Sequence, residues 1–198
     1  MKKSNIFLII ALLLFVNCDI NMKFKGDDKN WANMYKTRDI LIFTSTKSHD
    51  TIYINKAETK NTNVDLMVSN FNPICTNVDY NGSNNKVYNM FVICKEEPNT
   101  PVWIGFNFKN DKGRIRDIHS YPESEINFNG EKRRGYMFKP YKEDKPSFWW
   151  DLEYGLKNPT LEYFFWDKEF GIIEYKTMEG EVFVLEKFIR DEENILEL

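Results

Sequence analysis

Apolar and polar residues alternate in short runs along most of the chain, and clusters of turn-forming residues separate these runs. Alternation over about four to eight residues is typical of a strand with one buried face. Four pairs of runs predict β-hairpins, and no segment shows a long helical period. We therefore expect a mainly β domain, an antiparallel sandwich, barrel or half-barrel built from sequential hairpins. The paired runs are 40–46 with 51–56, 74–80 with 86–94, 102–109 with 114–121, and 171–177 with 182–189.

The turns between these runs also suggest how the strands pair. A four-residue loop in the first hairpin would place Phe43 opposite Ile54 and give the hairpin one apolar face. A loop of the same length in the last hairpin would place Tyr175 opposite Val184. Gly113 can adopt the positive φ that a hairpin turn requires, so we expect it in the turn of the third hairpin.

The first residues follow a different pattern. Lys2 and Lys3 precede eleven consecutive apolar residues, 6–16, and a polar stretch follows. A basic start and a short apolar run are typical of a signal peptide. A membrane-spanning helix would need about 20 apolar residues, so this run predicts export rather than a transmembrane segment.

The end of this run carries a resemblance. The residues Phe15-Val16-Asn17-Cys18 resemble the lipobox of bacterial lipoproteins, in the looser form found in Bacteroidetes. Asn17 stands where the common pattern has Gly, Ala or Ser, and Phe15 stands where Leu is usual. The resemblance implies that Cys18 becomes the N-terminus, carries acyl chains such as palmitate, and anchors the protein to the inner or outer membrane. Ordinary signal cleavage near Asn17, which would leave a soluble periplasmic protein, is the alternative.

Three segments are expected along the chain. Residues 1–17 would be the lipoprotein signal peptide, the polar residues 18–30 a tether, and residues 31–198 a single β-rich domain. The formal net charge is −3, and no stripe of basic residues indicates a nucleic-acid partner.

Two further cysteines, Cys75 and Cys94, lie in predicted strands on either side of one turn. An oxidising compartment would allow them to form a disulfide, and two buried thiols are the alternative. A tight hairpin centred near Ser83 would place Cys75 opposite Phe91, so a bridge requires a longer loop or a bulge.

The sequence offers little catalytic or metal-binding chemistry. His49 and His119 are the only histidines, and neither has metal-ligand spacing with the cysteines, so no metal or other cofactor is expected. Asp117 and Ser120 flank His119, but such neighbours often occur by chance, and no nucleophile motif accompanies them. Carboxylates in or near an aromatic segment give the alternative function, a periplasmic hydrolase. These carboxylates are Asp151, Glu153 and Glu162.

That aromatic segment, 147–170, is the most distinctive stretch of the chain, with nine aromatic residues among 24. Trp149, Trp150 and Trp166 are candidate ligand-binding residues, because tryptophans can line a groove for a sugar or a lipid. The alternative is that these side chains fill the core. Residues 165–188 are similar to the closing hairpins of uncharacterised Bacteroidetes lipoproteins, and some proteins with such hairpins form half-barrels that cradle acyl chains.

Asp50-Thr51-Ile52 resembles the acceptor motif of Bacteroidetes O-glycosylation, with an ordinary strand start as the alternative. Together these patterns favour a cell-envelope lipoprotein, anchored in the membrane, whose non-catalytic β domain binds a protein, a glycan or a lipid.

Overall fold

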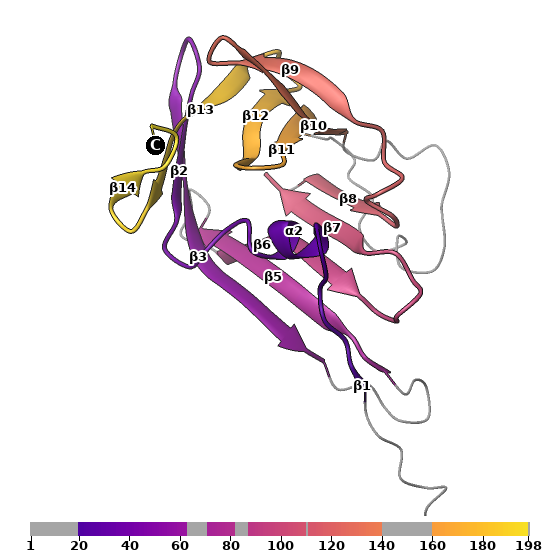
Figure 1. Ribbon diagram of the computed structural model, residues 1–198. Helices are drawn as coiled ribbons and strands as arrows, with labels where there is room; N and C mark the ends of the chain where they lie inside the picture. Colours follow the sequence, from indigo (N-terminus) through magenta and orange to yellow (C-terminus); the bar gives the residue numbers. More distant parts are fainter. Residues whose placement is uncertain (1–19, 63–70, 82–86, 110, 140–159, 198) are drawn as a thin grey trace, which may run out of the picture.

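A computed structural model describes residues 20–62, 71–81, 87–109, 111–139 and 160–197. These residues form a mainly β domain (Figure 1). One antiparallel sheet contains eleven of the described strands in a single path, and β14 is added to β13. A separate pair, β1 and β4, is parallel. The prediction of a mainly β fold made of sequential hairpins is therefore confirmed.

The strands fall into two arms that are each continuous in sequence. The N-terminal arm contains β2 (Ile40–Thr44), β3 (His49–Asn61), β5 (Ile74–Asn81), β6 (Val87–Lys95), β7 (Trp103–Phe108) and β8 (Asp111–Ile115). The C-terminal arm contains β9 (Ser124–Phe128), β10 (Glu131–Phe138), β11 (Leu161–Asp167), β12 (Gly171–Thr177) and β13 (Val182–Arg190), with β14 (Glu193–Asn194) at its end.

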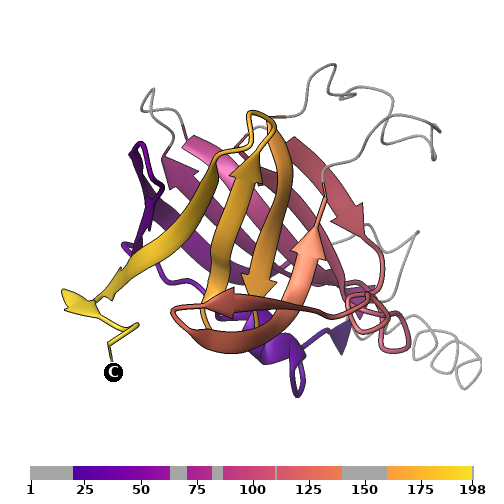
Figure 2. The same ribbon diagram turned by 90° about the horizontal axis from the view of Figure 1, so that it is seen from above.

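The arms join where β2 pairs with β13. Leu41 lies opposite Phe188, and Ile40 lies opposite Ile189. From this seam the sheet runs to β8 on one side and to β9 on the other. These two edge strands are consecutive in the chain but do not pair, so the curled sheet is a half-barrel, the third of the three predicted shapes. Seen from above, the two arms face each other across the interior (Figure 2).

Aromatic side chains fill this interior and connect the arms. Phe106 from β7 stacks on Phe138 from β10, with ring centroids 5.7 Å apart, and meets Phe164 from β11 edge-on at 4.9 Å. Burial of each such side chain stabilises the fold by about 1.5–3 kcal/mol. Asp111 makes a further link, because its buried carboxylate accepts hydrogen bonds from the backbone N–H groups of Thr160 and Leu161.

The prediction of a tether at 18–30 is wrong for the described residues of that segment. β1 (Ile20–Asn21) pairs with β4 (Phe71–Asn72), and α2 (Asp28–Ala32) packs across one end of the interior (Figure 1). Met22 and Phe24 alternate with exposed lysines and are buried. Because the segment is mostly polar, its pattern did not indicate that these two apolar side chains are buried. They attach the segment to the domain.

The four hairpins form near their expected positions, but two registers differ from the prediction. In the third hairpin the predicted strand 114–121 is wrong beyond Ile115, because the chain bends and turns at 116–121. Phe43 lies opposite Asp50 instead of Ile54, because the turn closes at 45–48. Tyr175 lies opposite Phe183 instead of Val184, because Gly180 adopts a φ of +87° in the loop and shifts the pairing by one residue.

Gly113 lies in β8 and not in the turn, where Lys109 takes the positive φ of 54° instead. Gly113 pairs with Phe106, whose ring atoms would lie 2.1–2.8 Å from an added Cβ. The glycine therefore makes room for the Phe106 ring.

Candidate functional site

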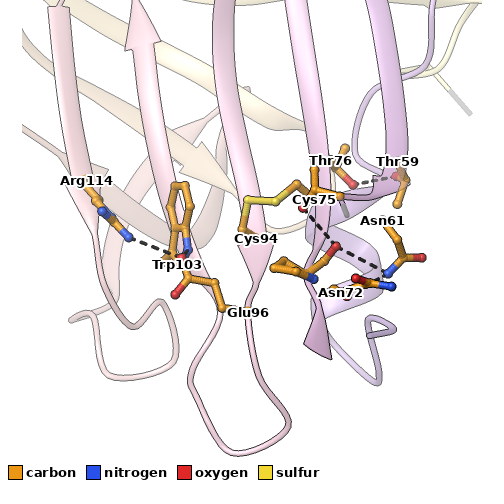
Figure 3. The surroundings of a disulfide bond; sticks show 11 residues. Thr59, Asn61, Asn72, Cys75, Thr76, Cys94, Glu96, Trp103 and Arg114 are labelled. Atoms are coloured by element: carbon orange, nitrogen blue, oxygen red, sulfur yellow. Dashed lines mark hydrogen bonds and ion pairs between the residues drawn. A yellow bond between two sulfur atoms is a disulfide. The ribbon is translucent and has the colours of Figure 1, made fainter. Parts of the chain in front are cut away.

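A disulfide joins Cys75 of β5 to Cys94 of β6. The two residues are direct register partners, with Cα atoms 4.2 Å apart. A longer loop, with Asn81 opposite Val87, and a bulge after Val78 together produce this pairing, as the sequence required one or the other. The bridge lies beside Trp103, the register partner of Cys94 on β7 (Figure 3).

Next to the disulfide, three side chains form a cluster that we call the Trp103 patch: Glu96, Trp103 and Arg114. The Arg114 guanidinium lies 4.1 Å from the centroid of the Trp103 ring, a cation–π contact. Trp103 Nε1 donates a hydrogen bond to Glu96 Oε1 at 2.8 Å, and Arg114 Nη2 lies 3.9 Å from the same oxygen. The patch therefore presents an aromatic ring, a cation and an anion together (Figure 3).

The sheet holds this patch on its outer face. Trp103 alternates with the inward-facing Ile104, and the side chains of Glu96 and Arg114 are about half exposed. Gly105 is the register partner of Arg114 and leaves room for the Trp103 indole. An added Cβ at this position would lie only 3.3 Å from the Trp103 ring. A Trp–Arg pair on an outer sheet face can stack on a partner and form hydrogen bonds with it.

Trp166 does not line an open groove. It is 3% exposed, stacks on Trp31 of α2 with centroids 5.2 Å apart, and meets Phe91 edge-on at 5.0 Å. For this residue the core alternative holds, because α2 covers it. Trp149 and Trp150 lie outside the described residues.

A small cavity lies between the described side chains of the interior, with a volume of about 10 Å³. Its lining is entirely apolar and includes Phe106, Phe164 and Trp166. Room for about one water molecule is far below the ~300–1,000 Å³ of a usual ligand pocket. This cavity is too small for an acyl chain.

A second polar cluster closes the upper end of the half-barrel, near the turn between β2 and β3. Asp50 Oδ2 lies 2.5 Å from Lys109 Nζ and accepts a hydrogen bond of the same length from Tyr175 Oη. Burial and the neighbouring Asp50 carboxylate raise the pKa of Tyr175 above its usual range. The three groups satisfy one another, so this cluster joins strands and offers no free nucleophile.

The histidine and carboxylate candidates have structural partners. His119 lies in a turn, where its Nε2 is 2.8 Å from Asp28 Oδ1, and Asp117 accepts a hydrogen bond from its backbone N–H. Glu162 is exposed and forms an ion pair with Lys176 at 2.7 Å. Asp151 and Glu153 lie outside the described residues.

Of the two candidate modification sites, the structure describes Thr51 and not Cys18. Thr51 is exposed on β3, where a glycan would have access, while the neighbouring Asp50 is engaged in the upper cluster. Glycosylation of Thr51 stays a prediction. Cys18 lies outside the described residues, and its lipid attachment also stays a prediction.

The chain matches no family model, no curated protein and no solved structure with which it was compared. Within the described ranges, no helix is long and apolar enough to cross a membrane. The same ranges contain no group of three or more His, Cys, Asp or Glu residues placed to hold a metal ion.

Sequence reasoning missed the Trp103 patch. Its residues lie at 96, 103 and 114 and become neighbours only when β6, β7 and β8 pair. The available signal was Trp103 itself, an aromatic residue on the polar side of an alternating strand.

Proposed function

We propose that the protein is a cell-envelope lipoprotein, anchored through Cys18, whose half-barrel binds a protein partner on its outer face around the Trp103 patch. The N-terminal sequence pattern supports export and lipid attachment. The Cys75–Cys94 disulfide supports an oxidising compartment, where such bonds form and persist.

The observation that carries the binding mode is the contrast between the two faces of the sheet. The described side chains of the interior are buried against one another, whereas Trp103 and Arg114 lie together on the outside. Tryptophan and arginine are enriched among the residues that contribute most to protein–protein affinity. A protein fits this patch better than a glycan, because the Arg114 guanidinium already covers the Trp103 ring on which a sugar would stack.

Site-specific photocrosslinking in intact cells tests the binding mode. A photoreactive amino acid at Arg114 should give an adduct with a protein of defined mass. The matched control is the same amino acid at Arg134, an exposed arginine of β10 that is ion-paired with Glu125. An adduct at both positions, at neither, or with a glycan alone would contradict the proposal.

The partner found in this way allows a quantitative test. Trp103→Ala should raise the Kd for this partner by about tenfold or more, as expected for a central interface residue. Membrane fractionation tests the anchor separately, because Cys18→Ala should release the protein into the soluble fraction.

A further inference from the structure

The N-terminal strand is fixed to the lower end of the half-barrel, where β3 ends and β5 begins (Figure 1). β1 pairs with β4, and the Met22 backbone N–H donates a hydrogen bond to the Asn72 carbonyl at 3.0 Å. The Asn61 side-chain amide donates to the carbonyls of Met22 and Asn72, at 3.0 and 3.1 Å. Asn72 in turn donates to the Asn21 side chain at 3.0 Å. The chain is therefore held to the domain from its first described residues.

This attachment limits how far the domain can lie from a lipid on Cys18. Cys18 precedes Ile20 by two residues, and an extended chain spans at most about 3.6 Å per residue. The start of β1 can therefore lie only about 7 Å from an acylated Cys18. Met22 and Phe24 are buried in the domain, so the residues after β1 cannot lengthen the connection to Cys18.

We propose that the domain rests directly on the phospholipid headgroups, with the β1–β4 end facing the bilayer and the turns 45–48 and 178–181 pointing away. This inference depends on the lipid anchor at Cys18 proposed above. The whole domain would then have a fixed orientation on the membrane and no freedom to move away on a flexible spacer.

The composition of this end suits contact with headgroups. Asn21, Asn61 and Asn72 form its hydrogen-bond network, and Lys60 is exposed next to it. Among the described residues, the large exposed apolar side chains lie elsewhere, at Tyr53, Val87, Met178 and Val182. The described residues exposed at this end are therefore polar, which suits contact with the polar layer of a bilayer.

The opposite end would be well separated from the membrane. β3 runs from the upper turn to the lower end over 13 residues, and a strand rises about 3.3 Å per residue. The β2–β3 turn would therefore lie roughly 40 Å from the lower end. This difference in distance from the membrane can be measured with fluorophores attached at the two ends. Lipid-attached nitroxides quench the fluorophore that lies nearer the bilayer more strongly.

The test uses the full-length, acylated protein reconstituted in phosphatidylethanolamine–phosphatidylglycerol vesicles that contain headgroup nitroxide lipid. Lys23→Cys probes the lower end, and Lys47→Cys is its matched control in the upper turn, since both lysines are exposed. With Cys18 acylated and Cys75–Cys94 oxidised, the introduced thiol is the only free one. We expect several-fold stronger quenching at position 23 than at position 47.

Inserting a Gly-Ser spacer of about 15 residues between Asp19 and Ile20 should reduce this difference while the protein stays on the vesicles, because such a linker reaches roughly 20 Å and lets the domain rotate. Equal quenching at the two positions in vesicle-bound protein without the spacer would overturn the proposed orientation and leave the lipid anchor intact. Absence of acyl mass on Cys18 would overturn the anchor and this inference together.

Discussion

At the scale of single residues, Gly171 shows how closely the loop after α2 packs against the sheet. Gly171 has a φ of +76°, and an added Cβ would lie 2.2 Å from Tyr35 Oη. That hydroxyl accepts a hydrogen bond from the Ile172 backbone N–H at 2.7 Å, so it has little freedom to move. The position therefore requires glycine for two reasons, its backbone conformation and the lack of space.

Replacing Gly171 with alanine should lower the free energy of unfolding by about 1–2 kcal/mol for the backbone and about 1–3 kcal/mol for the overlap. Gly180→Ala is the matched control, because Gly180 has a φ of +87° but open space around it. Urea unfolding of both variants measures the difference. Equal losses would mean that the Tyr35 contact is unimportant.

Arg190 holds the loop between α2 and β2 against β13 through a buried ion pair. Its guanidinium donates two hydrogen bonds to Asp39, at 3.0 and 2.6 Å, and one to the Met34 carbonyl at 2.8 Å. Asp39 is only 2% exposed, so it depends on this partner.

Arg190→Leu should lower the free energy of unfolding by about 3–5 kcal/mol, because a buried carboxylate would lose its counter-charge. Arg134→Leu, which removes an exposed ion pair with Glu125, should cost at most about 1 kcal/mol. Chemical denaturation distinguishes the two, and losses of similar size would contradict the assigned role of Asp39.

At the scale of elements, the disulfide fixes β5 to β6 near the lower end of the half-barrel. It closes a loop with a sequence separation of 19 residues, for which chain entropy predicts a stabilisation of about 3 kcal/mol. The Cys75→Ser/Cys94→Ser variant should lose about this much, measured by urea unfolding. A reductant should destabilise the natural chain similarly and leave the variant unchanged; a natural chain insensitive to reductant would contradict the prediction.

The elements also show which parts of the fold a sequence can predict. Turn residues and alternation located four hairpins, because both signals are local. They did not determine the registers, since Phe43 keeps its inward face whether it lies opposite Asp50 or Ile54. The contacts of Asp50 with Lys109 and Tyr175 are long-range, and no local pattern predicts them. α2 was missed because its segment is polar and only Trp31 and Ala32 are apolar.

At the scale of the whole molecule, buried tyrosines at both ends of the interior should make the domain sensitive to alkali. Burial raises the pKa of Tyr35 above its ordinary value of 10.0, and burial with the Asp50 carboxylate raises that of Tyr175. Above about pH 10 the unfolded chain loses these protons while the folded chain keeps them. The stability that they contribute is complete below that pH and falls as pH rises.

Urea unfolding at a series of pH values from about 8 to 11 should show this loss. The Tyr35→Phe/Tyr175→Phe double variant should lose less stability over the same interval, because phenylalanine has no proton to release. An unchanged pH dependence in the double variant would assign the effect to other groups.

The whole shape was only partly predictable. Alternating strands indicated a sandwich, barrel or half-barrel, and the choice among them depends on long-range pairing at the β2–β13 seam. The same holds for the candidate site: alternation alone places Trp103 on the outer face, but Arg114 and Glu96 reach it only in the assembled sheet. Trp166 could not be assigned to core or surface from the sequence, because the covering helix was not foreseen.

Among the described strands, β8 and β9 form the two edges of the sheet, and this has a consequence for how the molecule can be divided. The chain crosses between them at 116–123, where Pro122 and Glu123 are exposed, and each arm is continuous in sequence on its own side of this crossing. A cut at Pro122–Glu123 breaks no strand pairing, and the β2–β13 seam and the interior aromatic side chains still join the two pieces. The protein is thus built as two halves that could be expressed separately and mixed, with reassembly reported by the return of β-sheet circular dichroism.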